Sequence, residues 1–111
     1  MDTETNERAS TIFSALGHPT RLQITSLLLQ EGKSVNEVAA ALNLAQSSTS
    51  QHLAILARAG VLMVNQIAST RTYSVRGPRI GMILELIERF CDVHNLKGPA
   101  DLDIAEYTSK V

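Results

Sequence analysis

Residues 34–62 read SVNEVAAALNLAQSSTSQHLAILARAGVL, and this stretch decides the fold. Ser34 followed three residues later by Glu37 is a capping box, which predicts that a short helix begins there and ends near Leu42. After a turn, apolar residues recur at helical spacing and predict a second helix over residues 45–59, with a glycine at its end. A short helix, a tight turn and a second helix make a helix-turn-helix.

The chain on either side of this motif predicts the remaining elements. They are a helix over residues 6–16, a helix that His18-Pro19 opens and Gly32 stops, strands over residues 61–64 and 72–75 around the polar stretch 65–71, and a last helix that Gly77-Pro78 opens and residues 95–99 end. The second of these helices is expected to bury Leu22, Ile24, Leu27, Leu28 and Leu29. The predicted fold class is therefore mostly α with a small β-hairpin, a winged helix-turn-helix of order α-α-α-α-β-β-α over residues 1–99, followed by a polar, flexible tail over residues 100–111.

The length and composition exclude several classes of protein. A chain of 111 residues, 44% of them hydrophobic, forms one domain with a modest core. It has no apolar run of the roughly 18–20 residues that a membrane helix needs, and its first residues are polar and acidic, unlike a signal peptide. The single cysteine, Cys91, forms no internal disulfide, so a cytoplasmic protein is expected. No grouping of residues indicates catalysis, and the chain is expected not to be an enzyme.

The charge of the chain is unevenly distributed. The net charge is −1, but no Asp or Glu lies between Glu37 and Glu85. That stretch carries His52 and the arginines Arg58, Arg71, Arg76 and Arg79. A positive segment of this kind can face a polyanion although the whole molecule is slightly acidic, and this favours binding to nucleic acid.

The helix predicted over residues 45–59 starts with the side chains that a helix in the major groove of DNA needs. Its first two turns carry many short hydrogen-bonding groups, and Gln can bond adenine while Ser can bond bases or phosphates. Helical spacing turns Gln46, Ser47, Ser50 and Gln51 outward, with Ser48 and His52 at the flanks. In the wing, Thr70 and Arg71, with Arg76 just beyond it, are expected to contact phosphate or the minor groove. The alternative is an ordinary solvated start of a helix.

Three segments, GHPTRLQI at 17–24, QSSTSQHLAILARAGVL at 46–62 and RTYSV at 71–75, resemble the ArsR/SmtB family of bacterial repressors. The resemblance implies a homodimeric winged helix that is joined through its first and last helices. It also implies a double-stranded DNA operator of two pseudo-symmetric half-sites, from which an inducer releases the protein. The interface is expected to hold the apolar residues Ile12, Phe13, Leu16, Ile83, Leu86, Ile87 and Phe90.

The sensing sites of metal-responsive family members are missing from this sequence. Such members carry Cys-x-Cys in the third helix or Asp-x-His at the start of the last one, and residues 34–42 and 77–93 contain neither motif. No metal or other cofactor is therefore expected, and the inducing signal is left open. Cys91 and His94, three residues apart, are a candidate redox or inducer site. The alternatives are that Cys91 only packs, or that the pair supplies half of a metal site shared with a second copy.

A second function is also compatible with this sequence. Some winged helices bind proteins rather than DNA, and such a wing would expose apolar side chains. Ile67 is the only obvious candidate for one. We expect DNA binding to be favoured over this protein-interaction module because the middle of the chain carries arginines and no acids.

Overall fold

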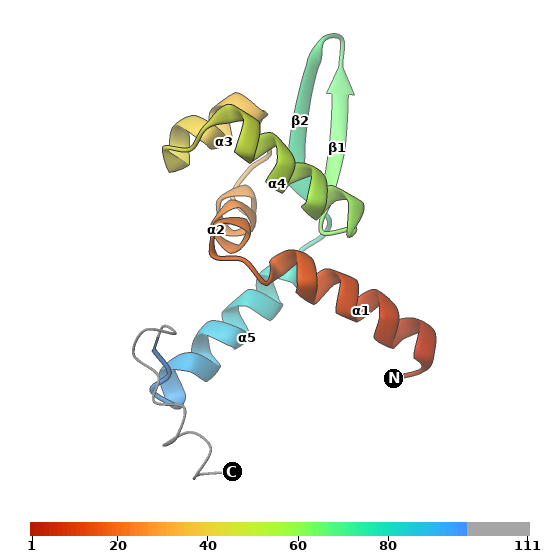
Figure 1. Ribbon diagram of the computed structural model, residues 1–111, viewed down its shortest axis with the longest axis vertical. Coiled ribbons are helices and arrows are strands. Elements are labelled where there is room, and N and C mark those ends of the chain that lie inside the picture. The colour runs from red at the N-terminus through yellow and green to blue at the C-terminus, as the bar shows by residue number, and fades with distance from the viewer. Residues whose placement is uncertain (98–111) are drawn as a thin grey trace. The chain divides into compact units, whose positions relative to one another are not determined.

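The computed structural model describes residues 1–97, and the tail predicted over residues 100–111 lies outside them. The elements are α1 (Thr3–Leu16), α2 (Pro19–Leu28), α3 (Val35–Leu42), α4 (Gln46–Arg58), β1 (Leu62–Ile67), β2 (Thr70–Val75) and α5 (Arg79–Val93) (Figure 1). This order confirms the predicted winged helix-turn-helix. The chain divides into two compact units after Gly81, and each unit is described by itself. The single domain over residues 1–99 stays a prediction.

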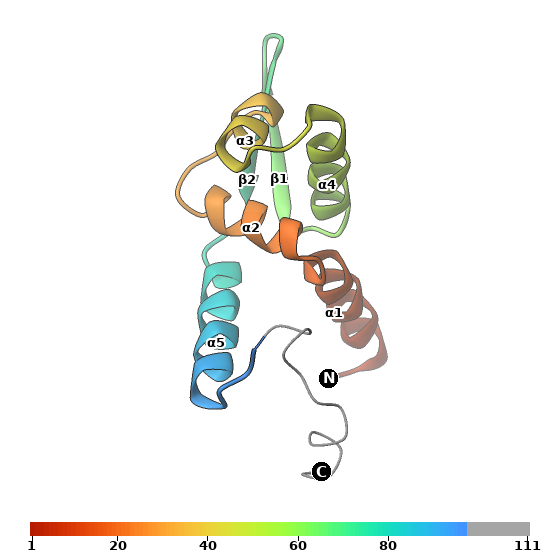
Figure 2. The same cartoon turned by 60° about the vertical axis from the view of Figure 1, so that its left-hand side comes forward.

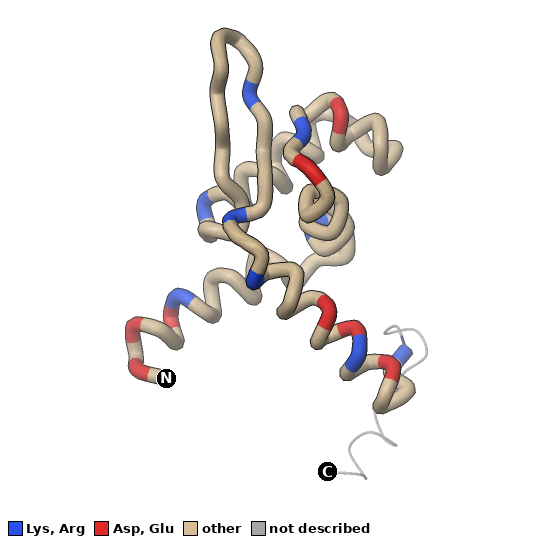
Figure 3. The backbone as a smooth tube through the Cα atoms, turned by 180° about the vertical axis from the view of Figure 1, so that it is seen from behind, with Lys and Arg blue, Asp and Glu red and all other residues tan. Residues whose placement is uncertain are grey.

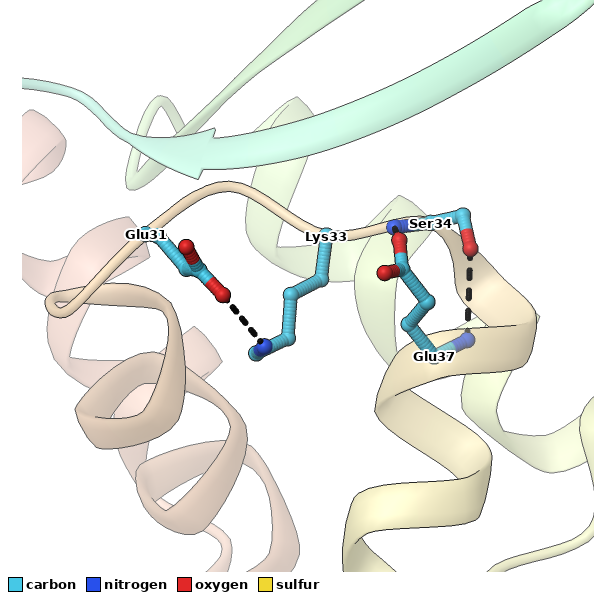
Figure 4. A network of polar contacts seen from close by, with 4 residues as sticks. All are labelled: Glu31, Lys33, Ser34 and Glu37. Carbon is cyan, nitrogen blue, oxygen red and sulfur yellow. Dashed lines mark hydrogen bonds and ion pairs between the residues drawn. The ribbon is translucent and has the colours of Figure 1, made fainter.

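The helix-turn-helix begins at the predicted capping box. Ser34 Oγ accepts from the Glu37 amide at 3.2 Å, and Glu37 Oε1 accepts from the Ser34 amide at 2.9 Å (Figure 4). Asn43 ends α3 in the left-handed conformation with φ of 54°, which Asn tolerates better than most residues. The turn places α3 and α4 side by side (Figures 1 and 2).

The core lies between α2, α3, α4 and the base of the hairpin. Its most deeply buried members are Ile24, Leu28, Val38, Leu53, Leu56, Val61 and Leu62. The hydroxyls of two buried threonines form hydrogen bonds to the backbone one turn earlier. Thr25 Oγ1 donates to the Arg21 carbonyl and Thr49 Oγ1 donates to the Ala45 carbonyl, each at 2.8 Å. Burial of Thr49, Leu53 and Leu56 fixes which face of α4 points away from the core.

The wing is a two-stranded antiparallel hairpin that is tied to the helix-turn-helix. Leu62 pairs with Val75 at its base, and the pairing runs out to the turn. The Lys33 amide donates to the Tyr73 carbonyl at 3.0 Å, and the Tyr73 amide donates to the Lys33 carbonyl at 2.8 Å. Lys33 Nζ also lies 3.1 Å from Glu31 Oε1 (Figure 4). The segment that enters α3 is therefore joined to β2 by one antiparallel bridge, between Lys33 and Tyr73.

Several predicted element boundaries were wrong. The first helix begins at Thr3 rather than residue 6, because Asp2 Oδ1 caps it by accepting from the Thr5 amide at 2.7 Å. The second helix ends at Leu28, before Gly32, and the fourth is one residue shorter at each end than 45–59. The stretch 65–71 was predicted as a loop, but the strands pair through it, and only Ala68 and Ser69 form the turn.

Two core positions predicted for the second helix were also wrong. Leu22 and Leu29 are exposed, whereas Ile24, Thr25 and Leu28 make the buried face. At 100° per residue, Leu22 and Leu29 lie about 100° around the helix from the centre of that face. In a run of consecutive leucines every position is equally hydrophobic, so the sequence does not show which of them lies at the centre of the buried face.

In the second unit, α5 carries no buried residue from Met82 to its end. Its large apolar side chains gather on one stripe and are exposed, with Leu86 60% and Phe90 54% accessible. Within residues 1–97, no helix is both long enough and apolar enough to cross a bilayer.

Candidate nucleic-acid interface

The start of α4 leaves its backbone amides without a side-chain cap. Ala45 occupies the N-cap position and cannot accept a hydrogen bond through its side chain. The first amides of a helix have no partner within the helix and carry a partial positive charge. A helix start that is both exposed and uncapped can therefore bind an anion such as a DNA phosphate.

The side chains of α4 are placed as the sequence predicted. Gln46, Ser47, Ser50 and Gln51 are exposed, and Ser48 and His52 are half-buried at the flanks. Ser48 Oγ donates to the Ala45 carbonyl at 3.1 Å, so its hydroxyl is partly committed to the helix. The exposed face therefore offers two amides and two hydroxyls that can pair with base edges. Contact of these residues with DNA stays a prediction.

The electrostatics of this region follow the distribution of charge along the chain. In Figure 3, α4 and the hairpin carry blue positions and no red ones. The ion pairs of the described residues, Arg8–Glu4, Lys33–Glu31 and Arg89–Glu85, all lie outside the acid-free stretch. Within residues 1–97, its arginines are therefore not neutralised by a carboxylate.

The three predicted wing residues lie at opposite ends of the hairpin, two next to the turn and one at the base. Thr70 and Arg71 begin β2 next to the turn and are exposed. Arg71 Nη2 donates to Gln66 Oε1 at 3.3 Å across the register pair. Arg76 lies at the base, where its Nε donates to the Gly60 carbonyl at 3.0 Å and joins the end of the hairpin to the end of α4. Arg76 therefore has a structural bond in addition to any contact with phosphate.

His52 contacts two residues at the start of α2, the N-cap residue His18 and Arg21. Its Nδ1 lies 3.3 Å from Arg21 Nη1, and its ring centroid lies 4.8 Å from that of His18. Because a guanidinium only donates, Nδ1 of His52 must accept and the ring is neutral in this contact. Burial, and then the charges of His18 and Arg21, lower the pKa of His52. His18 is the predicted cap of α2, since its Nδ1 accepts from the Thr20 amide at 3.1 Å.

Arg21 is a residue whose role sequence reasoning missed. It appeared there only as part of a segment that resembles a family, and no spacing rule connects it to residue 52. Its Nε donates to the Ala15 carbonyl at the end of α1, while Nη1 reaches His52 in α4.

The candidate sensing pair lies at the end of α5. Cys91 is half-buried, and the His94 ring packs on Phe90 with centroids 4.5 Å apart. No hydrogen bond joins Cys91 to His94 within the described part of the chain. Among those same residues, no three His, Cys, Asp or Glu side chains are grouped closely enough to hold a metal ion.

The residues assigned to a dimer interface differ in accessibility. Phe13 of α1 and Ile83, Leu86, Ile87 and Phe90 of α5 are exposed. Ile12 is half-buried and packs against the core. The assignment of Leu16 to the dimer interface was wrong. Leu16 is only 5% accessible and belongs to the core of its own chain, because the end of α1 packs on α2 and α4.

Comparison with known proteins supports this description. The profile described as "Bacterial regulatory protein, arsR family" matches residues 18–64. The transcriptional activator HlyU of Vibrio cholerae is 34% identical over 88 residues, which cover 78% of this chain and 82% of HlyU. The structure of reduced HlyU from that species matches with a TM-score of 0.68 at 33% identity, over 78% of this chain and 92% of HlyU. The transcriptional repressor PagR of Bacillus anthracis matches with a TM-score of 0.70 at 29% identity, over 78% of this chain and 99% of PagR.

The placement of His52 predicts how stability depends on pH. Because the folded chain lowers the pKa of His52 below 6.5, the unfolded chain binds the proton more readily. The free energy of unfolding should therefore fall as the pH is lowered through 6.5 and below. Urea unfolding of the wild type and His52→Gln between pH 7 and pH 5 measures the difference, with His94→Gln as the matched control. Equal slopes for the wild type and His52→Gln would contradict the assignment.

Proposed function

Since the chain belongs to the arsR family of bacterial regulatory proteins, we propose that it is a homodimeric transcriptional repressor that binds double-stranded DNA through α4 and the β1–β2 wing. Its family members and relatives are transcriptional regulators, so DNA-binding regulation of transcription is its general function. The observation that carries the finer proposal is the exposed, uncapped and acid-free start of α4. We assign the chain no catalytic activity and propose that it acts in the cytoplasm, where bacterial DNA is found.

Recognition of sequence is assigned to α4. Gln46 and Gln51 carry amides that can bond adenine in bidentate fashion, and Ser47 and Ser50 can bond bases or phosphates. The exposed amides at the start of the helix suit a phosphate beside the groove. The wing adds Arg71, a charged side chain that suits phosphate or the minor groove.

The homodimer is supported by apolar surface that the chain leaves exposed. Leu86 and Phe90 on α5 are more than half accessible, and Phe13 on α1 is 59% accessible. Covering such side chains with a second copy would remove apolar area from water, which is the main favourable contribution in most protein association. Two-fold symmetry would then present two copies of α4 to half-sites about one DNA turn apart, as in a pseudo-palindromic operator.

Repression is proposed because it requires only that the protein occupies its operator. Activation requires a further surface that contacts the transcription machinery. Relatives of both kinds exist, since PagR is a repressor and HlyU is an activator. A reporter gene placed behind the operator decides between them, and repression requires expression to rise when the regulator's gene is deleted.

A protein-interaction role is the second candidate, and one observation favours it. The sequence suggested Ile67 as the only exposed apolar residue of the wing, but Met63 and Val64 on β1 are exposed as well. Three exposed apolar side chains on one strand can contact another protein. Binding to DNA without any sequence preference would favour this candidate.

A second prediction separates base reading from phosphate contact. Gln51→Ala should weaken binding to DNA from upstream of the protein's own gene by about 1–3 kcal/mol, and should leave random DNA unaffected. Arg71→Ala should weaken both DNAs alike and reduce the salt slope by about 1. Fluorescence anisotropy over a salt series measures both effects. An equal loss for Gln51→Ala on random DNA would show that Gln51 does not read a base.

A third prediction concerns the missing cap of α4. Ala45→Asp supplies an N-cap acceptor and should raise the free energy of unfolding by about 0.5–2 kcal/mol. The same carboxylate should weaken DNA binding, since it occupies the amides and repels phosphate. Ala45→Ser is the matched control, because it supplies a cap without charge. If Ala45→Asp gains stability and still binds DNA as tightly as the wild type, the start of α4 does not lie in the DNA interface.

A fourth prediction tests the dimer. Leu86→Asp places a charge on the apolar stripe of α5 and should convert the dimer to a monomer in sedimentation equilibrium, with loss of tight DNA binding. Arg89→Asp introduces the same side chain outside the stripe and should remain dimeric. Circular dichroism verifies that both variants keep their helices. A monomeric variant that binds the operator tightly would contradict the proposed architecture.

A further inference from the structure

A shallow pocket of about 680 Å³, open to solvent over much of its surface, lies among α1, α2 and the end of α4. We propose that it binds a small organic anion with an apolar part, a carboxylate or a phosphate ester, and that its occupancy changes the affinity of α4 for DNA. The proposal rests on the proposed function, because it names the class of signal that the regulator would sense. Every residue of the pocket lies in the unit Met1–Gly81.

Two guanidinium groups line this pocket, from Arg21 and Arg58. Within residues 1–97 neither forms an ion pair. Among the described residues, Arg58 makes one hydrogen bond, from Nε to the Ala54 carbonyl of its own helix at 3.4 Å, and its two terminal nitrogens have no partner there. Two cations beside one cavity favour an anion, and Arg is the side chain best suited to carboxylate and phosphate oxygens.

The remaining walls define the rest of the ligand. Ser10 and Ser14 lie one turn apart on the same face of α1, and both line the pocket with exposed hydroxyl-bearing side chains. Ile55 of α4 supplies an apolar wall and is itself partly exposed. Hydroxyls and guanidiniums opposite an aliphatic wall suit a molecule with a charged end and an apolar body.

Arg21 connects this pocket to the face of α4 that is proposed to read DNA. Arg21 lines the pocket, and its Nη1 lies 3.3 Å from His52 Nδ1. His52 immediately follows Gln51 in α4. An anion that draws the guanidinium toward the pocket competes with His52 for the same donor. The side chain beside Gln51 would then lose its partner, so occupancy of the pocket and DNA binding are coupled.

Direct binding is tested without DNA. Benzoate and phenyl phosphate serve as anionic probes, and benzamide is the neutral probe of matched shape, each titrated into ¹⁵N-labelled protein and followed by NMR. The two anions should shift the resonances of Ser10, Ser14 and the Arg21 side chain, and benzamide should not. Arg58→Gln should weaken anion binding at least about tenfold, while Arg8→Gln, an exposed α1 arginine outside the pocket, should not. Equal shifts with benzamide, or unchanged binding to Arg58→Gln, would overturn the proposal.

Coupling is tested by anisotropy with DNA from upstream of the gene. A saturating anionic probe should change the dissociation constant of the wild type several-fold and leave that of Arg58→Gln unchanged. Anion binding without any effect on DNA affinity would overturn the coupling. A loss of DNA affinity in Arg58→Gln with no probe present, equal on upstream and random DNA, would make Arg58 a phosphate contact and overturn the assignment. If the wild type binds no DNA selectively, the proposed function fails, while the NMR titration still decides the pocket.

Discussion

The packing of the helices depends on the guanidinium of Arg21. Its Nε donates to the Ala15 carbonyl at the end of α1, and its Nη1 reaches His52 of α4, so one side chain of α2 joins three helices. A half-buried cation without a carboxylate loses hydration that only hydrogen bonds can replace. Both acceptors come within reach only when α1 and α4 are packed on α2. The requirement to satisfy this group therefore favours one arrangement of the helices among those that the apolar core alone would permit.

The packing of these helices also fixes which face of α4 points to solvent. Burial of Thr49, Leu53 and Leu56 sets the rotation of the helix, so the short polar side chains of its first turns point to solvent. The backbone pairing of Lys33 with Tyr73 holds the wing against the segment that enters α3. A surface that must match the spacing of base pairs benefits from elements whose positions are fixed by the core and not by flexible loops.

Sequence reasoning succeeded where one local rule acts alone. The capping box at Ser34, the cap at His18 and the outward face of α4 follow from spacing or from a single side-chain bond. It failed where several residues compete. A run of leucines hid which face of α2 is buried, and the length of the wing depended on cross-strand pairing that polar composition does not reveal. The bonds of Arg21 join residues far apart in the sequence, and the pocket beside them requires three helices to be in place, so neither could be predicted from the sequence.

The distribution of charge explains why the proposed recognition by α4 and the proposed assembly through α5 belong together. A chain of net charge −1, with acids near both ends of the described region, has little general attraction to DNA. One copy places only a few arginines near the wing, and a few phosphate contacts give weak and salt-sensitive binding. The neutral amides and hydroxyls of α4 must then supply selectivity, and each favourable base contact contributes about 1–3 kcal/mol. In the proposed homodimer, a second copy that covers the apolar stripe of α5 would double that small set of contacts and so permit tight binding. Because the uncharged face of α4 gives only weak binding in one copy, tight DNA binding requires the second copy that the exposed side chains of α5 are proposed to bind.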